Sequence, residues 1–421
     1  MALVSTSPQP APVLPLDQAL EVVEQYGKKL SIPTTEAVSI LSSLGRVLAE
    51  PILADRDFPP FPRSTRDGFA AKSADVQNVP TKLRVVGQIK AGGSFSRTLN
   101  SGEAVEIMTG ASAPEGSDAV VMVEYTNRDG DDVEVLRGCV AGENIVPAGS
   151  EAKAGREMVA PGVRISFAHV AVMAAVGRTQ FAVFKRPRVA ILSTGDEIVD
   201  AAQTPGRFQI RNSNSYSLAA QVIAAGGESW QLPIAADDPG ALRALIAQGL
   251  KADLLLLSGG VSMGKFDLVE QTLGELGAKF FFTGALIQPG KPVVFGEAVA
   301  QGGARPTPFF GLPGNPVSTM VTFDLFARPV LRGLGGALPV RLPVTKARLA
   351  KSIKTKTGLT RFLPARLQGP RFDPEVEVVS WQGSGDLMAS AQADCYLVAP
   401  PDRDQISAGE TVSILLRTCP D

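Results

Sequence analysis

The chain has 421 residues, of which 44% are hydrophobic and 20% are charged, and its 41 Lys and Arg side chains nearly balance 42 Asp and Glu side chains. A chain of this length exceeds one hydrophobic core, so we expect two to four domains. Its formal net charge of -1 gives no global attraction to nucleic acid or to a membrane, and no apolar run approaches the roughly 20 residues that span a bilayer.

Cysteine and histidine are scarce. The three cysteines, Cys139, Cys395 and Cys419, are too few and too scattered for a disulfide framework or a zinc site, which favours a reducing cytoplasm. A single histidine, His169, excludes metal clusters ligated by several histidines and argues against a Ser-His-Asp triad. Residues 1–15 contain four prolines and no basic residue, so we expect a disordered lead-in and neither a signal peptide nor a transit peptide.

The first elements along the chain are predicted to be helical. Apolar residues recur at three- and four-residue spacing over 16–30 and again over 34–48, which predicts two amphipathic helices. Residues 57–70 then form a proline-stiffened loop that would present Asp67 rigidly. The alternative is that Asp67 and Gly68 form an ordinary hairpin turn.

A small, barrel-like β domain is predicted over 82–146, because short alternating strands are separated by turns, including a hairpin turn at 129–132. Thr109 follows one of these strands, where its hydroxyl could face a ligand or lie in a surface turn. A helix predicted over 166–176 suggests that the β segment is inserted into a helical element whose two halves flank it.

Residues 188–335 alternate between strand and helix patterns, which is typical of an α/β domain with a mostly parallel sheet. Its central strand is the run of four leucines over 254–257, since such a run can be buried on both faces. The strand ends at Ser258 and Gly259, and a glycine-rich loop leads to Asp267, which would open a helix over 266–276. A glycine turn followed by an ordinary helix start is the alternative.

Local signals also mark helix boundaries in this region. Asn212 and Gly226 lie at the start and near the end of one predicted helix, and Pro239 occupies the first position of the next. Asn315 is the predicted N-cap of a further helix that begins at Pro316.

Four loops follow strands of this sheet, at 195–197, 237–238, 258–267 and 311–318. Ligands of open α/β sheets lie beyond the carboxyl ends of the strands, so we expect these loops to converge. Main-chain amides and Lys291 would bind phosphate oxygens, while three carboxylates would hold Mg²⁺, namely Glu197, Asp237 and Asp267. This arrangement predicts phosphoryl or anhydride chemistry, although the chain has neither a Walker A loop nor a Gly-x-Gly-x-x-Gly fingerprint.

Residues 344–418 return to short strands and predict a second small β domain. Arg361 and Ser384 are its candidate ligand residues if they face the cleft, and ordinary surface residues if they do not. The predicted fold class is therefore a multi-domain α/β plus β protein, with a three-layer α/β domain, two small β-barrel-like domains and a discontinuous helical domain.

Eight motifs in register resemble one known family. They lie at 63–70, 107–111, 147–149, 193–197, 258–267, 288–292, 311–318 and 382–385. Together they resemble the molybdopterin molybdenumtransferases, the MoeA proteins and the E domain of gephyrin. The resemblance covers nearly the whole chain from about residue 16.

The resemblance implies an elongated homodimer with an active site between subunits. Its domains would be a helical domain at 1–53 and 153–187, an inserted β domain at 54–152, a molybdopterin-binding α/β domain at 188–335 and a C-terminal β-barrel domain at 336–421. The implied reaction inserts molybdate into adenylylated molybdopterin, with Mg²⁺-dependent release of AMP. The implied partners are small-molecule substrates, with transient contacts to the molybdopterin adenylyltransferase and to apo-molybdoenzymes.

The same resemblance assigns roles to particular residues. Catalytic roles fall to Asp67, Thr109, Glu197, Asp237 and Asp267, with the last three at the metal and Asp67 and Thr109 facing the partner's α/β domain. Lys291, Arg361 and Ser384 would lie near molybdate. The full predicted substrate-binding set is Thr194, Gly195, Ser258, Gly259, Gly260, Ser262, Gly264, Gln288, Pro289, Gly290, Lys291, Pro313, Gly314, Asn315, Pro316, Ser318, Arg361 and Ser384.

The chain departs from the usual family pattern at several of these motifs. Thr65 and Arg66 replace Ala-Met before the Asp-Gly pair, and Glu151 stands where an Asp is common. Gln288 replaces a Lys of many members, and Gly284 replaces a basic residue. Our hypothesis is that losing two cations weakens oxyanion affinity or shifts selectivity toward tungstate, with Arg66 as partial compensation; an unchanged molybdate affinity in Gln288→Lys would remove its basis.

Two other functions remain open from the sequence. The adenylyltransferase that precedes this step shares a similar molybdopterin-binding domain, but it would not need the flanking helical and β domains. A scaffold that has kept the fold without the chemistry is the second alternative, and co-purification with a membrane receptor would favour it. The intact acidic set of Asp67, Glu197, Asp237 and Asp267 argues against it.

Overall fold

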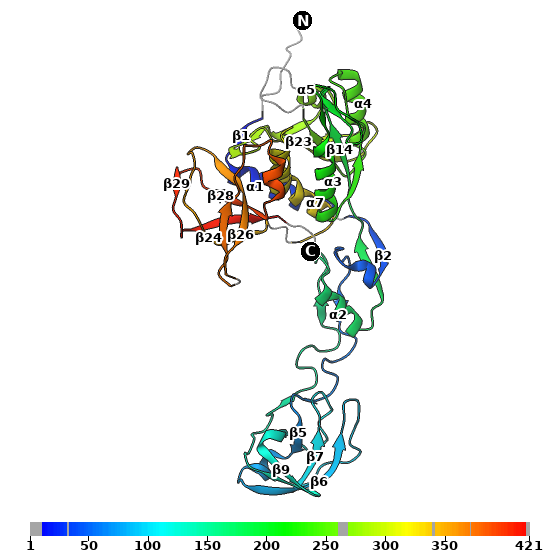
Figure 1. The fold of residues 1–421 in the computed structure, drawn as a ribbon. Coiled ribbons are helices and arrows are strands. Elements are labelled where there is room, and N and C mark those ends of the chain that lie inside the picture. The colour runs from blue at the N-terminus through cyan, green and yellow to red at the C-terminus, as the bar shows by residue number, and fades with distance from the viewer. Residues whose placement is uncertain (1–10, 32, 260–267, 339–341, 371, 418–421) are drawn as a thin grey trace.

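The computed structural model describes residues 11–31, 33–259, 268–338, 342–370 and 372–417. The molecule is elongated, with three parts in a row (Figure 1). At one end an α/β sheet and the C-terminal barrel form one body. A narrow middle module carries β2 (Thr35–Ser39) and α2 (Phe167–Ala175), and a separate insertion sheet lies at the other end.

A six-stranded sheet forms the centre of the α/β body. Its strand order is β17-β14-β18-β23-β22-β19. The first four strands are parallel, and the last two are antiparallel to their neighbours. The bounds are β17 (Glu228–Gln231), β14 (Arg188–Ser193), β18 (Leu254–Ser258), β23 (Pro306–Leu312), β22 (Val294–Val299) and β19 (Lys279–Phe282). The predicted mostly parallel sheet is confirmed.

Helices cover both faces of this sheet, so its central strand is buried on both sides. In β18, Leu254 and Leu256 face one hydrophobic cluster and Leu255 and Leu257 face the other, and none of the four is exposed. Each such side chain contributes about 1.5–3 kcal/mol by leaving water. One face carries α1 (Leu16–Lys28), α3 (Ser213–Ala225), α6 (Pro316–Thr322) and α7 (Arg328–Leu334), and the other carries α4 (Pro239–Gly249) and α5 (Leu268–Glu275).

The predicted boundaries of α3 and the predicted start of α4 are confirmed. The Asn212 side chain caps α3 by accepting a hydrogen bond from the Ser215 amide, and Gly226 ends the helix in the left-handed region with φ of 99°. Asp238 caps α4 in the same way, with Pro239 in the first turn. Local capping chemistry therefore determines these boundaries.

The predicted second helix over 34–48 is wrong. These residues form β2 and a single 3-10 turn, η1 (Leu41–Ser43), and β2 pairs antiparallel with β13 (Gln180–Phe184). β-Branched Thr35 and Val38 suit this pairing, but the partner strand is distant in sequence, so the local periodicity gave no sign of it. The preceding helix α1 packs into the core of the α/β body through Ala19 and Val23.

The middle module is formed by two distant stretches of chain. Strands β2, β3 (Ile52–Leu53), β12 (Glu157–Val159) and β13 surround a small core with α2. That core includes Leu48, Ile52, Met173 and Val183, all fully buried. The predicted helix over 166–176 is confirmed as α2.

The insertion sheet contains six strands in the order β8-β5-β7-β6-β10-β9, and separate hydrophobic clusters line its two sides. The bounds are β8 (Ala119–Met122), β5 (Gly68–Ala71), β7 (Glu103–Ile107), β6 (Thr81–Ile89), β10 (Asp132–Val135) and β9 (Thr126–Asp129). The predicted hairpin turn at 129–132 joins β9 to β10.

The C-terminal residues form a five-stranded barrel, because β28 pairs back with β26. Its strands are β26 (Thr360–Gln368), β27 (Glu375–Val378), β24 (Val344–Leu349), β30 (Thr411–Leu416) and β28 (Cys395–Ala399). β21 (Ile287–Gln288) pairs in parallel with β26. Phe362, Tyr396 and Leu415 of the barrel pack in the hydrophobic core of the α/β body. The barrel and the α/β sheet therefore share a core.

The remaining elements are short. They are β1 (Val13–Leu14), β4 (Arg63–Ser64), β11 (Ile145–Val146), β15 (Ile198–Val199), β16 (Ile210–Arg211), β20 (Gly284–Ala285), β25 (Ile353–Lys354), β29 (Gln405–Ile406), α8 (Leu387–Ala391), the 3-10 turns η2 (Ser73–Val76) and η3 (Val123–Tyr125), and a π-helical turn, η4 (Phe323–Ala327). Among the described residues, none of the helices has the length and apolar character that crossing a bilayer requires.

Candidate functional site

The carboxyl ends of three parallel strands lie at one edge of the α/β sheet, which we call the rim. Ser193 of β14 is in register with Ser258 of β18, which is in register with Leu312 of β23. The Thr194 amide donates to the Ser258 carbonyl at 3.1 Å, and the Gly259 amide donates to the Leu312 carbonyl at 3.3 Å. The first residues after these strands therefore lie side by side, whereas 260–267 of the predicted loop lie outside the described residues.

Two glycines allow the rim loops to approach closely. Gly259 has φ of +90°, and a Cβ there would lie 2.6 Å from the Thr194 carbonyl oxygen. Gly195 has φ of +135°, and its Cβ would lie 2.5 Å from an oxygen of the Glu197 carboxylate. Both positions need glycine, and Glu197 consequently lies against bare backbone.

Two of the predicted metal carboxylates lie on adjoining rim loops. The Asp237 amide donates to the Asp196 carboxylate at 3.1 Å, which joins the loop after β17 to the loop that carries Glu197. In the part of the chain that the structure describes, no three metal-ligating side chains gather. The third predicted ligand, Asp267, lies outside the described residues, as do Gly260, Ser262 and Gly264.

Asn214 is a rim residue that was not among the residues predicted from the sequence. It is buried in the first turn of α3, and its amide nitrogen donates to Ser258 Oγ at 2.9 Å and to the Gly314 carbonyl at 2.7 Å. Its Oδ1 atom and the buried Thr194 Oγ1 have no hydrogen-bond partner among the described residues. Buried polar atoms normally have partners, so these two are suited to bind a polar ligand. The polar run 212–214 was the available signal, but it was interpreted as helix capping alone.

Other predicted binding residues of the α/β body lie at or near the start of α6. Asn315 is the N-cap and Pro316 occupies the first turn, as predicted. The Val317 amide donates to the Ser384 carbonyl at 3.0 Å, which brings the barrel loop 382–385 to this helix start. Because Pro313 and Gly314 connect this helix to β23, these residues adjoin the rim.

The loop over 288–291 packs against the same helix. Gly290 has φ of +106°, and a Cβ there would meet Thr322 Cγ2 of α6 at 2.4 Å. Gln288 of β21 is in register with Arg361 of β26, and Pro289 follows through a cis peptide bond. Lys291 therefore follows a glycine that packs against α6, and Arg361 lies on the strand that pairs with Gln288.

Gly284 and Glu151, two of the departures from the family pattern, have definite surroundings. Gly284 is buried, and a Cβ there would lie 3.0 Å from Val13 and 3.2 Å from the Lys291 carbonyl, so a long basic side chain would displace the contact with β1. Glu151 accepts a hydrogen bond from Arg63 at 2.7 Å in an exposed ion pair.

Asp67 and Thr109 contact each other in the insertion sheet. The Thr109 amide and hydroxyl both donate to Asp67 Oδ1, at 2.6 and 2.8 Å. These two bonds, the amide first, hold the pKa of the Asp67 carboxyl below its usual value. The alternative of a hairpin turn at Asp67 and Gly68 is wrong, because β4 pairs with β11 and β5 pairs with β7 and β8.

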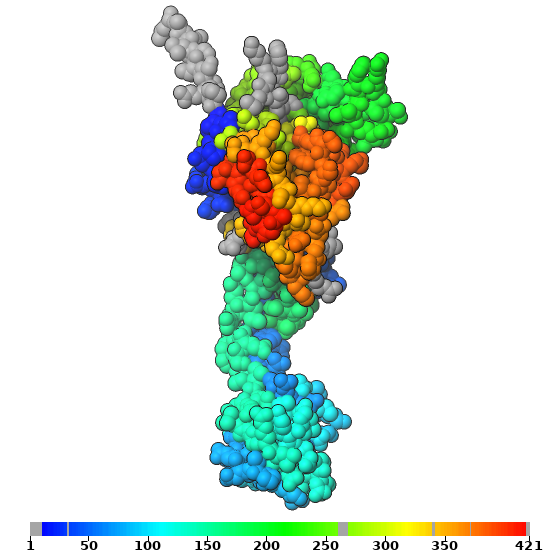
Figure 2. Space-filling view, turned by 60° about the vertical axis from the view of Figure 1, so that its left-hand side comes forward, coloured from blue at the N-terminus to red at the C-terminus, as the bar shows by residue number. Residues whose placement is uncertain are grey.

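Within one chain the predicted site is divided between two ends of the molecule. Figure 1 shows β5 and β7 at one end and the α/β sheet at the other, with α2 and β2 between them. Figure 2 shows the same separation from a second direction. The structure places Glu197 and Asp237 on adjoining loops and Ser258 at the end of a neighbouring strand, all in the α/β sheet, whereas Asp67 lies at the other end of the molecule.

Three family models match consecutive parts of the chain. The MoeA N-terminal region (domain I and II) matches residues 14–177, a probable molybdopterin binding domain matches 190–333, and the MoeA C-terminal region (domain IV) matches 346–416. A molybdopterin molybdenumtransferase of Nostoc sp. is 37% identical over 391 residues, which cover 90% of this chain and 88% of that protein. The chain belongs to the MoeA family.

Further MoeA relatives extend over the same length. A molybdopterin molybdenumtransferase of Bacillus subtilis is 31% identical over 413 residues, covering 96% of this chain and 94% of that protein. The crystal structure of a molybdopterin biosynthesis MoeA protein from Pyrococcus horikoshii is 33% identical, with a TM-score of 0.69 and coverage of 96% and 99%. The resemblance and the predicted fold class are thus confirmed.

Proposed function

We propose that this chain is a molybdopterin molybdenumtransferase, which inserts molybdate into adenylylated molybdopterin and releases AMP with the help of Mg²⁺. The observation that carries the proposal is the rim, where glycine loops, amides and carboxylates of the family's motifs converge. Relatives that are molybdopterin molybdenumtransferases match at least nine-tenths of the chain, which supports the transfer of molybdenum.

The cationic groups beside the rim suit this chemistry. Molybdate is a dianion, and its acceptor carries a dithiolene and a phosphate chain that are also negatively charged, so the reactants repel each other. Lys291 and Arg361, with the amides at the start of α6, would offset that repulsion. Ser318 and Ser384 would add hydrogen-bond donors at the same place.

The donor set at the rim fits Mg²⁺. This ion prefers oxygen ligands and is commonly bound by one or two carboxylates together with substrate phosphates, and Glu197 and Asp237 lie on adjoining loops. Asp267 is the third carboxylate that we expect from the sequence. When bound, Mg²⁺ would neutralise the charge that develops as AMP leaves.

The active site is proposed to form between two copies of this chain. Asp67 and Thr109 would face the rim of a second copy, since they lie at the opposite end of their own chain. The middle module exposes three large apolar side chains, with 81% of Leu41, 58% of Leu44 and 84% of Phe167 accessible, which suits a homodimer contact. Asp67 would position the substrate or hold its proton.

We also propose that the protein acts in a reducing compartment, the cytoplasm. Cys139 and Cys395 are free and buried, and burial raises their pKa values to about 11 and about 12, so neither thiol is poised for disulfide exchange. Fractionation of cells that express the tagged chain tests this localisation.

Release of AMP tests the proposed reaction. With adenylylated molybdopterin, molybdate and Mg²⁺, the wild type should release AMP, and Glu197→Gln and Asp237→Asn should lose most of that release. Glu275→Gln is the matched control, because this exposed carboxylate pairs only with Arg243 and Gln271 among the described residues. Synthesis of the adenylylated substrate from a nucleoside triphosphate would instead indicate an adenylyltransferase, and binding without any AMP release would indicate a scaffold.

A further inference from the structure

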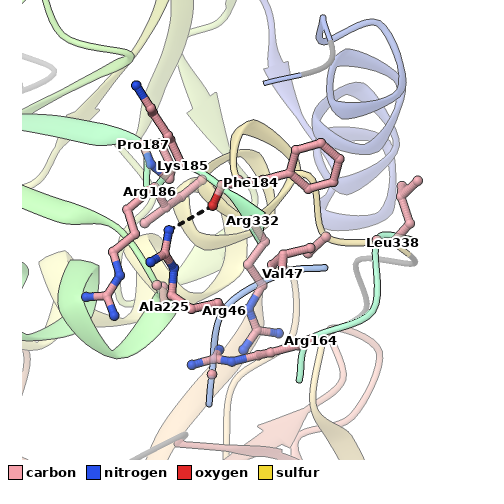
Figure 3. Close-up of a pocket in the computed structure, with 16 residues that line it drawn as sticks. Arg46, Val47, Arg164, Phe184, Lys185, Arg186, Pro187, Ala225, Arg332 and Leu338 are labelled. Atoms are coloured by element: carbon pink, nitrogen blue, oxygen red, sulfur yellow. Dashed lines mark hydrogen bonds between the residues drawn. The ribbon is translucent and has the colours of Figure 1, made fainter. Parts of the chain in front are cut away.

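A positively charged hollow lies at the junction of the α/β body and the middle module, away from the rim. Its volume is about 130 Å³. Figure 3 shows basic side chains from separate elements beside it, with the Lys185 amine directed away from the arginines. They are Arg46 after η1, Arg164 before α2, Lys185 and Arg186 after β13, and Arg332 of α7.

Most of this charge has no acidic partner. Arg46 is neutralised by Glu36 and also donates to the Phe184 carbonyl at 3.0 Å. No acidic residue lines the hollow, and in the described ranges no ion pair is formed by Arg164, Lys185 or Arg186. Lys185 and Arg186 attract Glu36, which is already paired with Arg46. Asp324 attracts Arg332 but is already paired with Arg328 at 3.5 Å.

The guanidinium group of Arg332 has a hydrogen-bond donor without an acceptor. Its Nε atom is buried and has no hydrogen-bond partner among the described residues. Burial, followed by repulsion from Arg328 and Arg164, lowers the pKa of Arg332 to about 10. Burial, followed by repulsion from Arg186, also lowers the pKa of Arg164. A bound anion would relieve both the repulsion and the missing hydrogen bond.

We infer that the hollow lined by Arg164, Lys185, Arg186 and Arg332 binds a small tetrahedral oxyanion, such as free inorganic phosphate. Guanidinium groups match the oxygens of such ions by donating two parallel hydrogen bonds, and they keep their charge at any physiological pH. The volume suits an ion of this size better than a nucleotide.

An anion in this position would join the two parts of the chain that the hollow separates. Arg332 belongs to the α/β body, whereas Arg164 and Arg186 belong to the middle module. Direct polar links at this junction include the bond from the Leu338 amide to the Gly162 carbonyl at 2.9 Å and the bond from Arg164 to the Ala224 carbonyl at 3.3 Å. The anion would therefore strengthen the junction that orients the insertion sheet relative to the body.

Equilibrium dialysis of the full chain against radiolabelled phosphate, at constant ionic strength set with sodium chloride, tests this site. We expect the dissociation constant for phosphate to rise at least tenfold in the double variant Arg164→Gln, Arg186→Gln. At phosphate concentrations near the wild-type dissociation constant, the double variant should therefore lose most of the phosphate that the wild type binds in the hollow. Both side chains reach the solvent and neither belongs to a hydrophobic core, so the change should not prevent folding, and circular dichroism checks this. Lys251→Gln, an exposed cation of the same body, should bind as the wild type does.

A rim variant separates this site from the proposed active site. Lys291→Gln should keep the phosphate that the double variant loses, and Arg332→Gln should lose it. The inference is overturned if the wild type and the double variant bind equal amounts, if equivalent chloride displaces the phosphate, or if only Lys291→Gln loses it. Stronger competition by AMP than by unlabelled phosphate would overturn the assignment to a free oxyanion.

Discussion

At the rim, Gly259 and Thr194 meet in a closed contact above fully buried strands, whereas at the other end of the molecule Asp67 is an exposed carboxylate held by two bonds from Thr109. The rim has the shape and donors that bind a ligand, and the insertion sheet presents one oriented charge. In the proposed reaction, the rim would bind the substrate and Asp67 would come from another part of the fold, so the two parts would have to meet for AMP to be released.

The largest effect should come from removing the remote charge. Asp67→Asn keeps the size of the side chain but loses its negative charge, and AMP release should fall by about 10²–10⁴-fold, the usual range for a group that handles a proton. Binding of adenylylated molybdopterin at the rim should change little. Asp129→Asn, on an exposed carboxylate of the same sheet, is the control and should keep full activity.

A change at the rim should affect binding instead. Gly259→Ala places a methyl group 2.6 Å from the Thr194 carbonyl and strains a backbone with φ of +90°, so the loop must move. We expect roughly 10²-fold lower AMP release, together with weaker binding of the adenylylated substrate in calorimetry. Gly92→Ala has a similar φ of +81° with no atom within 4 Å of the new methyl group, and it should stay active.

A smaller effect is expected where the cationic side of the rim departs from the family pattern. Gln288→Lys adds a charge beside Arg361 at an exposed position, and molybdate affinity should rise by a few-fold, as for a solvent-exposed charge pair. Binding of molybdate and tungstate, measured side by side, checks both affinity and selectivity. Unchanged affinity for both ions would refute a role for Gln288 in oxyanion selection.

The smallest effect should be a displaced pH profile. Two bonds from Thr109 lower the pKa of Asp67, so the carboxylate form is present above that lowered pKa and is lost as the pH falls through it. Thr109→Val removes the hydroxyl bond and keeps the amide bond, so the acid limb of the AMP-release profile should move to higher pH. Thr109→Ser retains the hydroxyl and should leave the limb in place.

Much of the α/β body could be predicted because its signals are local. The run of leucines over 254–257, the Asn212 cap and the glycines after the strands each act within a few residues, and all were interpreted correctly. The segment 34–48 was not, because its strand pairs with residues far along the chain. Tertiary pairing overrode the local pattern.

The candidate site could also be predicted only where its signals are local. The glycine loops of the rim follow strands and could be recognised. Asn214 bonds to groups 44 and 100 residues away, and the polar run 212–214 does not reveal those partners. The separation of Asp67 from the rim also depends on the path of the chain through the middle module, which no spacing in the sequence reveals.

Mixed dimers test the central claim most directly. Chains carrying Asp67→Asn are combined with differently tagged chains carrying Glu197→Gln, and the heterodimer is isolated. If each site takes Asp67 from one chain and the rim from the other, one site holds both defects and the second is intact, so AMP release should recover to about half of the wild-type value while both parent homodimers stay inactive. A heterodimer as inactive as its parents would contradict the account.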